Sequence, residues 1–107
     1  MSPQTPFSII YSPETKEHLR VIDKKYYTLI RTTIQERLSF MPNEENTNRK
    51  PLKRPVLETA TWELRFGPEN MFRVFYDVQL STREVYVLAI GVKLRNRLSI
   101  GGEEIVL

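Results

Sequence analysis

The chain reads WELRFGPENMFRVFYDV over residues 62–78. Residues 62–66 and residues 72–78 each place an apolar side chain at every second position, which is the period of a half-buried strand. Gly67 and Pro68 interrupt this alternation, so residues 67–71 are predicted to form the connecting loop. The stretch therefore predicts an antiparallel hairpin with one face against a core.

The position of the loop sets the register of the hairpin. Phe66 then faces Phe72, and each further cross-strand pair on that face is also apolar. On the other face the same register places Arg65 directly opposite Arg73. Like charges in this position destabilise a sheet by roughly 0.2 to 1 kcal/mol, so a compensating group is expected.

Two compensations are open at this point. Glu63 lies diagonal to both arginines and could neutralise them as a surface ion cluster. Alternatively, Arg65 and Arg73 could cradle an anion such as a phosphate, which planar and permanently charged guanidinium groups bind well.

Residues 85–92 are nearly all apolar, which is typical of a strand at the centre of a sheet. With residues 79–83 as the loop before it, Ala89 is predicted to lie beside Arg73, and Gly91 further along the same face. These small residues would leave a shallow concavity. Three cations follow the strand and are predicted to extend the same cationic face, although simple solvation remains an alternative: Lys93, Arg95 and Arg97.

The N-terminal part predicts one strand and two helices. Residues 7–11 are β-branched and aromatic and form the strand, after which Ser12 is predicted to cap a short amphipathic helix that Pro13 begins. A second helix, ended by Pro42, follows from apolar residues spaced three and four apart: Tyr27, Ile30, Ile34, Leu38 and Met41. Two helices so close in sequence form a hairpin that covers one face of the sheet.

Residues 43–55 are polar and rich in turn-forming residues, and they are predicted to form a loop rather than an element. The loop carries four cations, which could reach the rim of the cationic face: Arg49, Lys50, Lys53 and Arg54. The fold prediction is thus an α+β domain in which an N-terminal strand and a helical hairpin pack on an antiparallel sheet with a three-stranded meander.

The length of 107 residues suits a single domain, residues 1–107. The chain has no cysteine and one histidine, His18, which argues against disulfides, thiolate or histidine metal sites and a Ser-His-Asp triad. We expect neither a metal nor a cofactor. No apolar run approaches the roughly 20 residues of a membrane span, and the first residues do not read as a secretion signal, so a cytoplasmic protein is expected.

The positive charge is concentrated in the second half of the chain. Residues 1–48 hold six Lys and Arg against six Asp and Glu, whereas residues 49–107 hold ten against seven. This asymmetry points to a polyanionic partner, either a nucleic acid or an acidic protein, and a charged face that is merely solvated is the open alternative.

Three runs of sequence, residues 62–65, 72–78 and 87–93, resemble the RelE/ParE superfamily of bacterial toxins, including its RelE-like and HigB-like branches. The predicted order of elements also matches that family. The resemblance implies the toxin of a type II toxin–antitoxin pair, which a small antitoxin neutralises. RelE-like and HigB-like members cleave messenger RNA on the ribosome without a metal ion, whereas ParE-like members inhibit DNA gyrase without catalysis.

The resemblance also implies roles for individual residues. Arg65 and Arg73 match positions that contact the scissile phosphate, and Lys93 matches a basic position after the last strand. Glu63 stands where the best-known RelE-like enzymes carry a lysine, and HigB-like members often carry glutamate there, so it could serve as a base or pair with the arginines. The remaining cations are expected to bind the RNA backbone: Lys50, Lys53, Arg54, Arg95 and Arg97.

The leading hypothesis is therefore a ribosome-dependent messenger-RNA endonuclease toxin that needs no metal. Its expected partners are a cognate antitoxin, the ribosome and messenger RNA. Two alternatives stay open, a ParE-like inhibitor of DNA gyrase and a catalytically inactive member that binds only its antitoxin. The C-terminal segment offers no tyrosine or histidine as a proton donor, which leaves the acid–base chemistry open.

Overall fold

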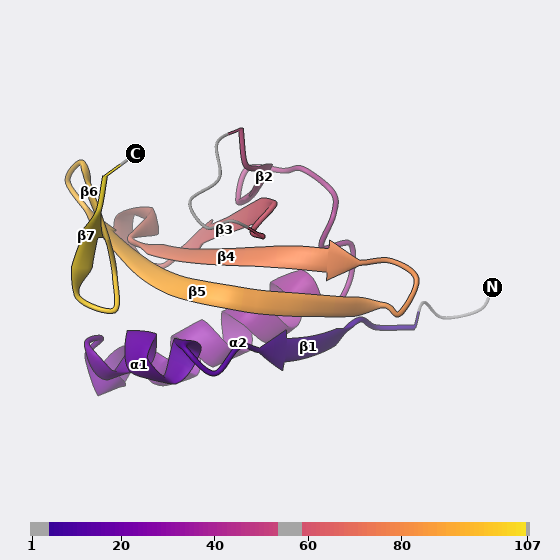
Figure 1. Cartoon of the computed structure of the whole chain (residues 1–107), viewed down its shortest axis with the longest axis horizontal. Coiled ribbons are helices and arrows are strands. Elements are labelled where there is room, and N and C mark those ends of the chain that lie inside the picture. The colour runs from indigo at the N-terminus through magenta and orange to yellow at the C-terminus, as the bar shows by residue number, and fades with distance from the viewer. Residues whose placement is uncertain (1–4, 54–58, 107) are drawn as a thin grey trace.

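The computed structural model describes residues 5–53 and 59–106, and it shows two helices alongside a seven-stranded sheet (Figure 1). The predicted α+β fold is confirmed. The elements follow one another as β1 (Ser8–Tyr11), α1 (Thr15–Arg20), the 3-10 helix η1 (Lys24–Tyr26), α2 (Tyr27–Leu38), β2 (Arg49–Pro51), β3 (Trp62–Phe66), the 3-10 helix η2 (Pro68–Asn70), β4 (Phe72–Gln79), β5 (Glu84–Leu94), β6 (Arg97–Ile100) and β7 (Glu103–Ile105).

The hairpin of β3 and β4 has the predicted register. Phe66 pairs with Phe72, and Arg65 pairs directly with Arg73. The loop between the strands begins at Gly67, whose φ of 83° is one that residues with a side chain rarely adopt. A Cβ atom at this position would also lie 2.5 Å from Cδ2 of Phe72, so both the backbone and the packing require glycine.

The register between β4 and β5 differs from the prediction, because Arg73 lies opposite Gly91 and not beside Ala89. One residue of this shift arises because Gln79 is still paired, with Glu84, which leaves a loop of residues 80–83. A second residue comes from an irregularity at Phe75, where β5 contributes one extra residue to the ladder. Because the two shifts add up to two residues, Ala89 and Gly91 remain on the same face as Arg73, as predicted.

Strand β5 organises the sheet because it has three neighbours. Strand β4 pairs along one edge, while β1 and β6 share the other edge, β1 in parallel and β6 antiparallel. The prediction of a plain loop at residues 43–55 is wrong for residues 49–51, which form β2 and pair with β3. The tail after residue 95 forms a further hairpin, β6 and β7, that sequence alone did not reveal.

The predicted cap of the first helix is wrong. The backbone N–H of Ser12 donates to the Val87 carbonyl at 2.9 Å and thereby continues the ladder of β1. Its hydroxyl donates to the Leu88 carbonyl at 3.2 Å instead of capping a helix, and α1 begins only at Thr15. Attachment to β5 therefore outweighs the local capping preference of serine.

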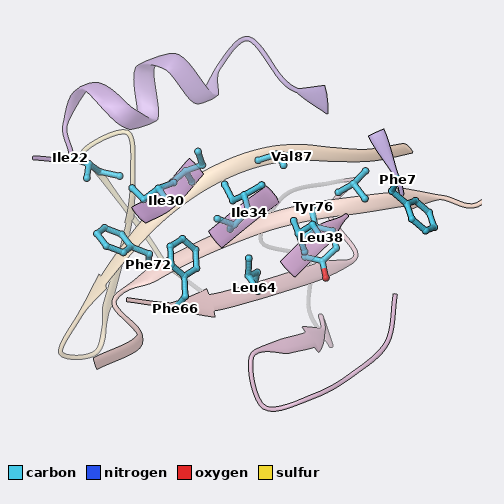
Figure 2. Close-up of a cluster of buried hydrophobic side chains, with 13 residues drawn as sticks. Phe7, Ile22, Ile30, Ile34, Leu38, Leu64, Phe66, Phe72, Tyr76 and Val87 are labelled. Carbon is cyan, nitrogen blue, oxygen red and sulfur yellow. The ribbon is translucent and has the colours of Figure 1, made fainter. Parts of the chain in front are cut away.

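Helix α2 packs its apolar stripe against the sheet, with Ile30, Ile34 and Leu38 buried (Figure 2). Met41 does not join the stripe, because the helix ends at Leu38 and Met41 is 48% exposed. The residue before a proline avoids the right-handed helical region, and Met41 precedes Pro42. The core also holds the Tyr76 hydroxyl, which donates to the Pro42 carbonyl at 2.6 Å.

The opposite face of the sheet carries a second, smaller apolar cluster around Phe75 and Ala89. Residues of β6 complete it, Leu98 and Ile100. Side chains alternate between the faces of a strand, so Glu63, Arg65 and Arg73 also belong to this face, away from the helices. The paired arginines thus lie on the face of the sheet that the helices leave uncovered.

Candidate functional site

A groove of about 800 Å³ lies over the face of the sheet that the helices leave uncovered. Glu63, Arg65 and Arg73 lie along it, and we call it the basic groove. Of the described side chains that line it, five are cationic and three are acidic. The other cations are Lys50, Lys53 and Lys93, and apolar residues of β6 and β7 complete the lining, among them Leu98 and Ile105.

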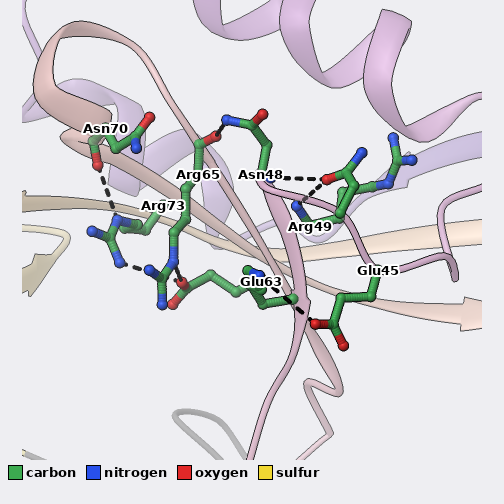
Figure 3. Close-up of polar contacts among 9 residues, drawn as sticks. Glu45, Asn48, Arg49, Glu63, Arg65, Asn70 and Arg73 are labelled. Carbon is green, nitrogen blue, oxygen red and sulfur yellow. Dashed lines mark hydrogen bonds and ion pairs between the residues drawn. The ribbon is translucent and has the colours of Figure 1, made fainter.

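Glu63 connects the two arginines that face each other (Figure 3). Its Oε1 atom accepts hydrogen bonds from Nε of Arg65 and from Nη1 of Arg73, the latter at 3.3 Å. The Glu63 side chain is only 9% exposed. Of the two compensations that the register left open, the structure therefore contains the internal one, and the three groups together keep one net positive charge.

Arg73 is held firmly by its surroundings. Its side chain is 11% exposed, and its Nε donates to the Asn70 carbonyl at 3.0 Å. Burial lowers the pKa of Arg73, and the Glu63 carboxylate opposes this by favouring the charged form. Since the ordinary pKa of a guanidinium is far above neutrality, Arg73 carries its charge at any physiological pH.

Arg65 combines a fixed backbone with a more accessible side chain. Its side chain is 40% exposed. Its backbone N–H donates to the Asn48 carbonyl at 2.8 Å, and the Asn48 side-chain amide donates to the Arg65 carbonyl at 2.9 Å. These two hydrogen bonds fix the backbone of Arg65 and therefore the point from which its side chain extends.

The segment before β2 is organised by a polar network that sequence reasoning did not identify. Oδ1 of Asn46 accepts from the backbone N–H groups of Asn48 and Arg49, at 2.8 and 2.7 Å. The Arg49 guanidinium donates to the carbonyls of Arg37 and Glu44, each at 3.0 Å. The network ties the end of α2 to the strand that holds Arg65. Asparagine in a polar stretch indicates a turn, but no sequence signal relates Asn48 to a residue of β3.

Most of the predicted cations that the structure describes meet at the basic groove. Lys93 lines it at the end of β5, with its backbone N–H bonded to the Met71 carbonyl at 2.7 Å. Lys50 and Lys53 line the side formed by β2, where Nζ of Lys50 is 3.7 Å from a carboxylate oxygen of Glu45. Arg54 lies outside the described residues.

The other two predicted cations lie further away. Arg95 lines a smaller groove of about 410 Å³ that shares Arg73 and Lys93 with the basic groove. Arg97 instead lines a groove next to α1, and its Nε is 3.9 Å from a carboxylate oxygen of Glu104. Because side chains alternate along β6, Leu98 faces the basic groove and Arg97 does not. The prediction of one continuous cationic face is therefore wrong at Arg97.

The groups that could transfer protons in the basic groove are carboxylates and lysines. Among its described lining residues there is neither histidine nor tyrosine. Within residues 5–53 and 59–106, no three His, Cys, Asp or Glu side chains are grouped so as to hold a metal ion. No helix in that part of the chain is long and apolar enough to cross a membrane.

No family model and no curated protein sequence matches the chain. Its structure, however, is similar to that of a chain in the toxin–antitoxin complex RelBE2 from Mycobacterium tuberculosis, with a TM-score of 0.68. The two are 17% identical, and the match covers 87% of this chain and 98% of the other. The RelE-like fold that the sequence resemblance implied is confirmed.

Proposed function

We propose that this chain, which shares its fold with a chain of a toxin–antitoxin complex, is a toxin that inhibits translation by cleaving messenger RNA on the ribosome. The observation that carries the proposal is the trio of Glu63, Arg65 and Arg73 on the open face of the sheet. Two guanidinium groups beside one carboxylate supply the charges that metal-free RNA cleavage requires.

Arg65 and Lys93 would contact the phosphate, and the charge of Arg73 would act on it from behind Glu63. In this reaction negative charge builds up on the phosphoryl oxygens, and preorganised cations in a partly enclosed site stabilise it. Arginine is suited to this role because its planar group donates two parallel hydrogen bonds to a phosphate. Lys93 lines the same groove and adds a third positive charge.

The proton transfers would fall to Glu63 and a lysine. The ribose 2′-oxygen attacks the phosphorus and its proton passes to the Glu63 carboxylate. The bond from phosphorus to the 5′-oxygen breaks, and that oxygen takes a proton from an ammonium group, a role that we assign to Lys93 because it lines two grooves together with Arg73. The products are a 2′,3′-cyclic phosphate and a 5′-hydroxyl end.

Lys50 and Lys53 would bind the RNA backbone next to the cut. They line the groove next to the arginines and offer point charges without a fixed geometry. Such contacts release counterions, so binding should weaken steeply as salt increases. Arg95 is proposed to extend this surface. RNA binding by Arg54 stays a prediction from the sequence.

The proposal includes a cognate antitoxin that binds the chain and silences it. The solved structure with the same fold is a toxin–antitoxin complex, which supports such a partner. Action on ribosomes would place the protein in the cytoplasm.

The test is induced expression in a bacterial host, followed by mapping of transcript 5′ ends on ribosome-bound messages. The proposal expects growth arrest and new 5′-hydroxyl ends within codons for the natural chain, none for Arg65→Ala, and the natural pattern for Arg97→Ala, a cation outside the basic groove. Double-strand DNA breaks without new transcript ends would favour a gyrase inhibitor. Growth without any effect would favour an inactive member.

A further inference from the structure

Arg65 and Arg73 share one oxygen of Glu63, but the two side chains differ in burial and in their other contacts (Figure 3). Arg73 is 11% exposed and has a second acceptor, the Asn70 carbonyl. Arg65 is 40% exposed, and within the described part of the chain its guanidinium has no recorded acceptor besides Glu63. Separating a charge pair costs more when both partners are buried, so the contact to Arg65 is the easier one to break.

We infer that Glu63 occupies the position of an oxyanion ligand, and that a phosphate enters the basic groove by taking Arg65 away from Glu63 while Arg73 keeps it. Arg65 is then the residue that contacts the ligand. Arg73 is a positioning residue, which holds the carboxylate in place. The inference rests on the proposed function only in taking the phosphate to be one of RNA.

The chemistry of the groups supports this exchange. A carboxylate and a phosphate accept hydrogen bonds from a guanidinium in the same way, so one can replace the other at Arg65. The positive groups of the groove outnumber its acidic groups, which attracts an anion despite the presence of Glu63. Glu63 thus lowers the affinity of the groove for small anions without excluding them.

The exchange also changes what Glu63 can do. In the free protein its Oε1 atom accepts from both arginines. Once Arg65 turns to a phosphate, that oxygen loses one donor and can accept from a ribose 2′-hydroxyl next to the same phosphate. Binding of the substrate would then prepare the base, and a ligand without a phosphate would not.

The first experiment measures the affinity of the full chain for inorganic phosphate by calorimetry, at constant ionic strength. Glu63→Gln removes the competing charge and should bind phosphate at least about tenfold more tightly than the natural chain, because a close charge within a groove is poorly screened. The matched control is Glu104→Gln, which removes an acidic group from the same groove and leaves the contacts of Arg65 and Arg73 unchanged. An equal gain in both variants, or in neither, would overturn the inference.

The second experiment uses the natural chain and does not depend on the folding of a variant. Phosphate is titrated while the side-chain ¹⁵Nε signals of Arg65 and Arg73 are followed by NMR, with both signals assigned in the natural chain by through-bond correlation to the backbone. The Arg65 signal should move with phosphate and the Arg73 signal should stay close to its starting position. Movement of the Arg73 signal alone, or of both equally, contradicts the division of roles.

These outcomes can be separated from those of the proposed function, since no ribosome or RNA cleavage is involved. Transcript cleavage together with an unmoved Arg65 signal would remove the inference and leave the function. An Arg65 signal that moves, in a chain that cuts no transcript, would keep the anion exchange and remove the function.

Discussion

Arg65 and Arg73 face each other directly across β3 and β4, and a single carboxylate oxygen joins their guanidinium groups. As a pair they make the position of Glu63 necessary, because like charges directly opposite in a sheet repel. The same pair leaves one positive charge in excess at the groove.

Replacing Glu63 by alanine should destabilise the protein. The substitution leaves two adjacent cations without their shared acceptor, and one of them, Arg73, is largely buried. We expect the free energy of unfolding to fall by about 1 to 3 kcal/mol. Urea denaturation checks this, with Glu104→Ala as the control for loss of an exposed acidic side chain. Equal stability of the two variants would contradict the account of the trio.

Substitutions of the two arginines should affect stability and activity differently. Arg65→Ala is expected to lower the rate of transcript cleavage by about 100-fold or more, because it removes a cation that would contact the phosphate. It should cost little stability, because the Arg65 side chain is half-exposed. Arg73→Ala is expected to reduce both, since it also gives up the bond to the Asn70 carbonyl. Thermal unfolding and cleavage of ribosome-bound RNA are measured on the same preparations. A larger loss of stability at Arg65 than at Arg73 would count against the geometry.

His18 should make stability depend on pH. Its Nδ1 accepts from the Ile90 N–H at 3.2 Å, and burial lowers its pKa below the ordinary value of 6.5, although Glu14 and Glu17 oppose the shift. Between that lowered pKa and pH 6.5 the unfolded chain binds more protons than the folded one, so stability is highest above pH 6.5 and falls as the pH is lowered through this interval.

The control for this dependence is His18→Asn, whose side-chain oxygen can accept the same backbone N–H but does not titrate. Unfolding by urea between pH 5 and 8 should show the decline in the natural chain and a flatter profile in the variant. Identical profiles would show that His18 does not cause the decline.

Gly67→Ala should weaken the hairpin that carries the arginines. The residue has a φ of 83°, and the added Cβ would lie 2.5 Å from a ring atom of Phe72. We expect a loss of more than about 1 kcal/mol in the free energy of unfolding. Gly102→Ala is a useful comparison, since its φ is also positive at 85° but its Cβ would meet only Val21 at 3.5 Å. A smaller loss at Gly67 than at Gly102 would argue against the packing described for the loop.

The register of β3 and β4 was predictable because Leu64 and Phe66 on one strand and Phe72 and Val74 on the other leave few ways to bury all four side chains. The register of β5 was not. A two-residue shift keeps its apolar side chains on the same faces, so the pattern cannot distinguish Ala89 from Gly91 as the neighbour of Arg73.

The short strands could not be predicted from the sequence for a different reason. Residues 49–51 are polar and include a proline, and they form a strand only because β3 offers a free edge to pair with. Arg97 was predicted to extend the cationic face because it follows the strand of residues 85–92. The hairpin of β6 and β7, which the sequence did not reveal, turns it away from the groove. Sequence placed Glu63 beside both arginines, but only the structure shows that one oxygen serves both.

The most direct test of metal-free RNA cleavage adds the purified chain to ribosomes programmed with a defined messenger RNA. A metal chelator is present that is strong enough to remove trace transition metals but not ribosomal Mg²⁺. We predict cleavage within a codon that leaves a 5′-hydroxyl end, its loss in Arg65→Ala, and its retention in Arg97→Ala. Intact messenger RNA with the natural chain, or cleavage that survives Arg65→Ala unchanged, would contradict it.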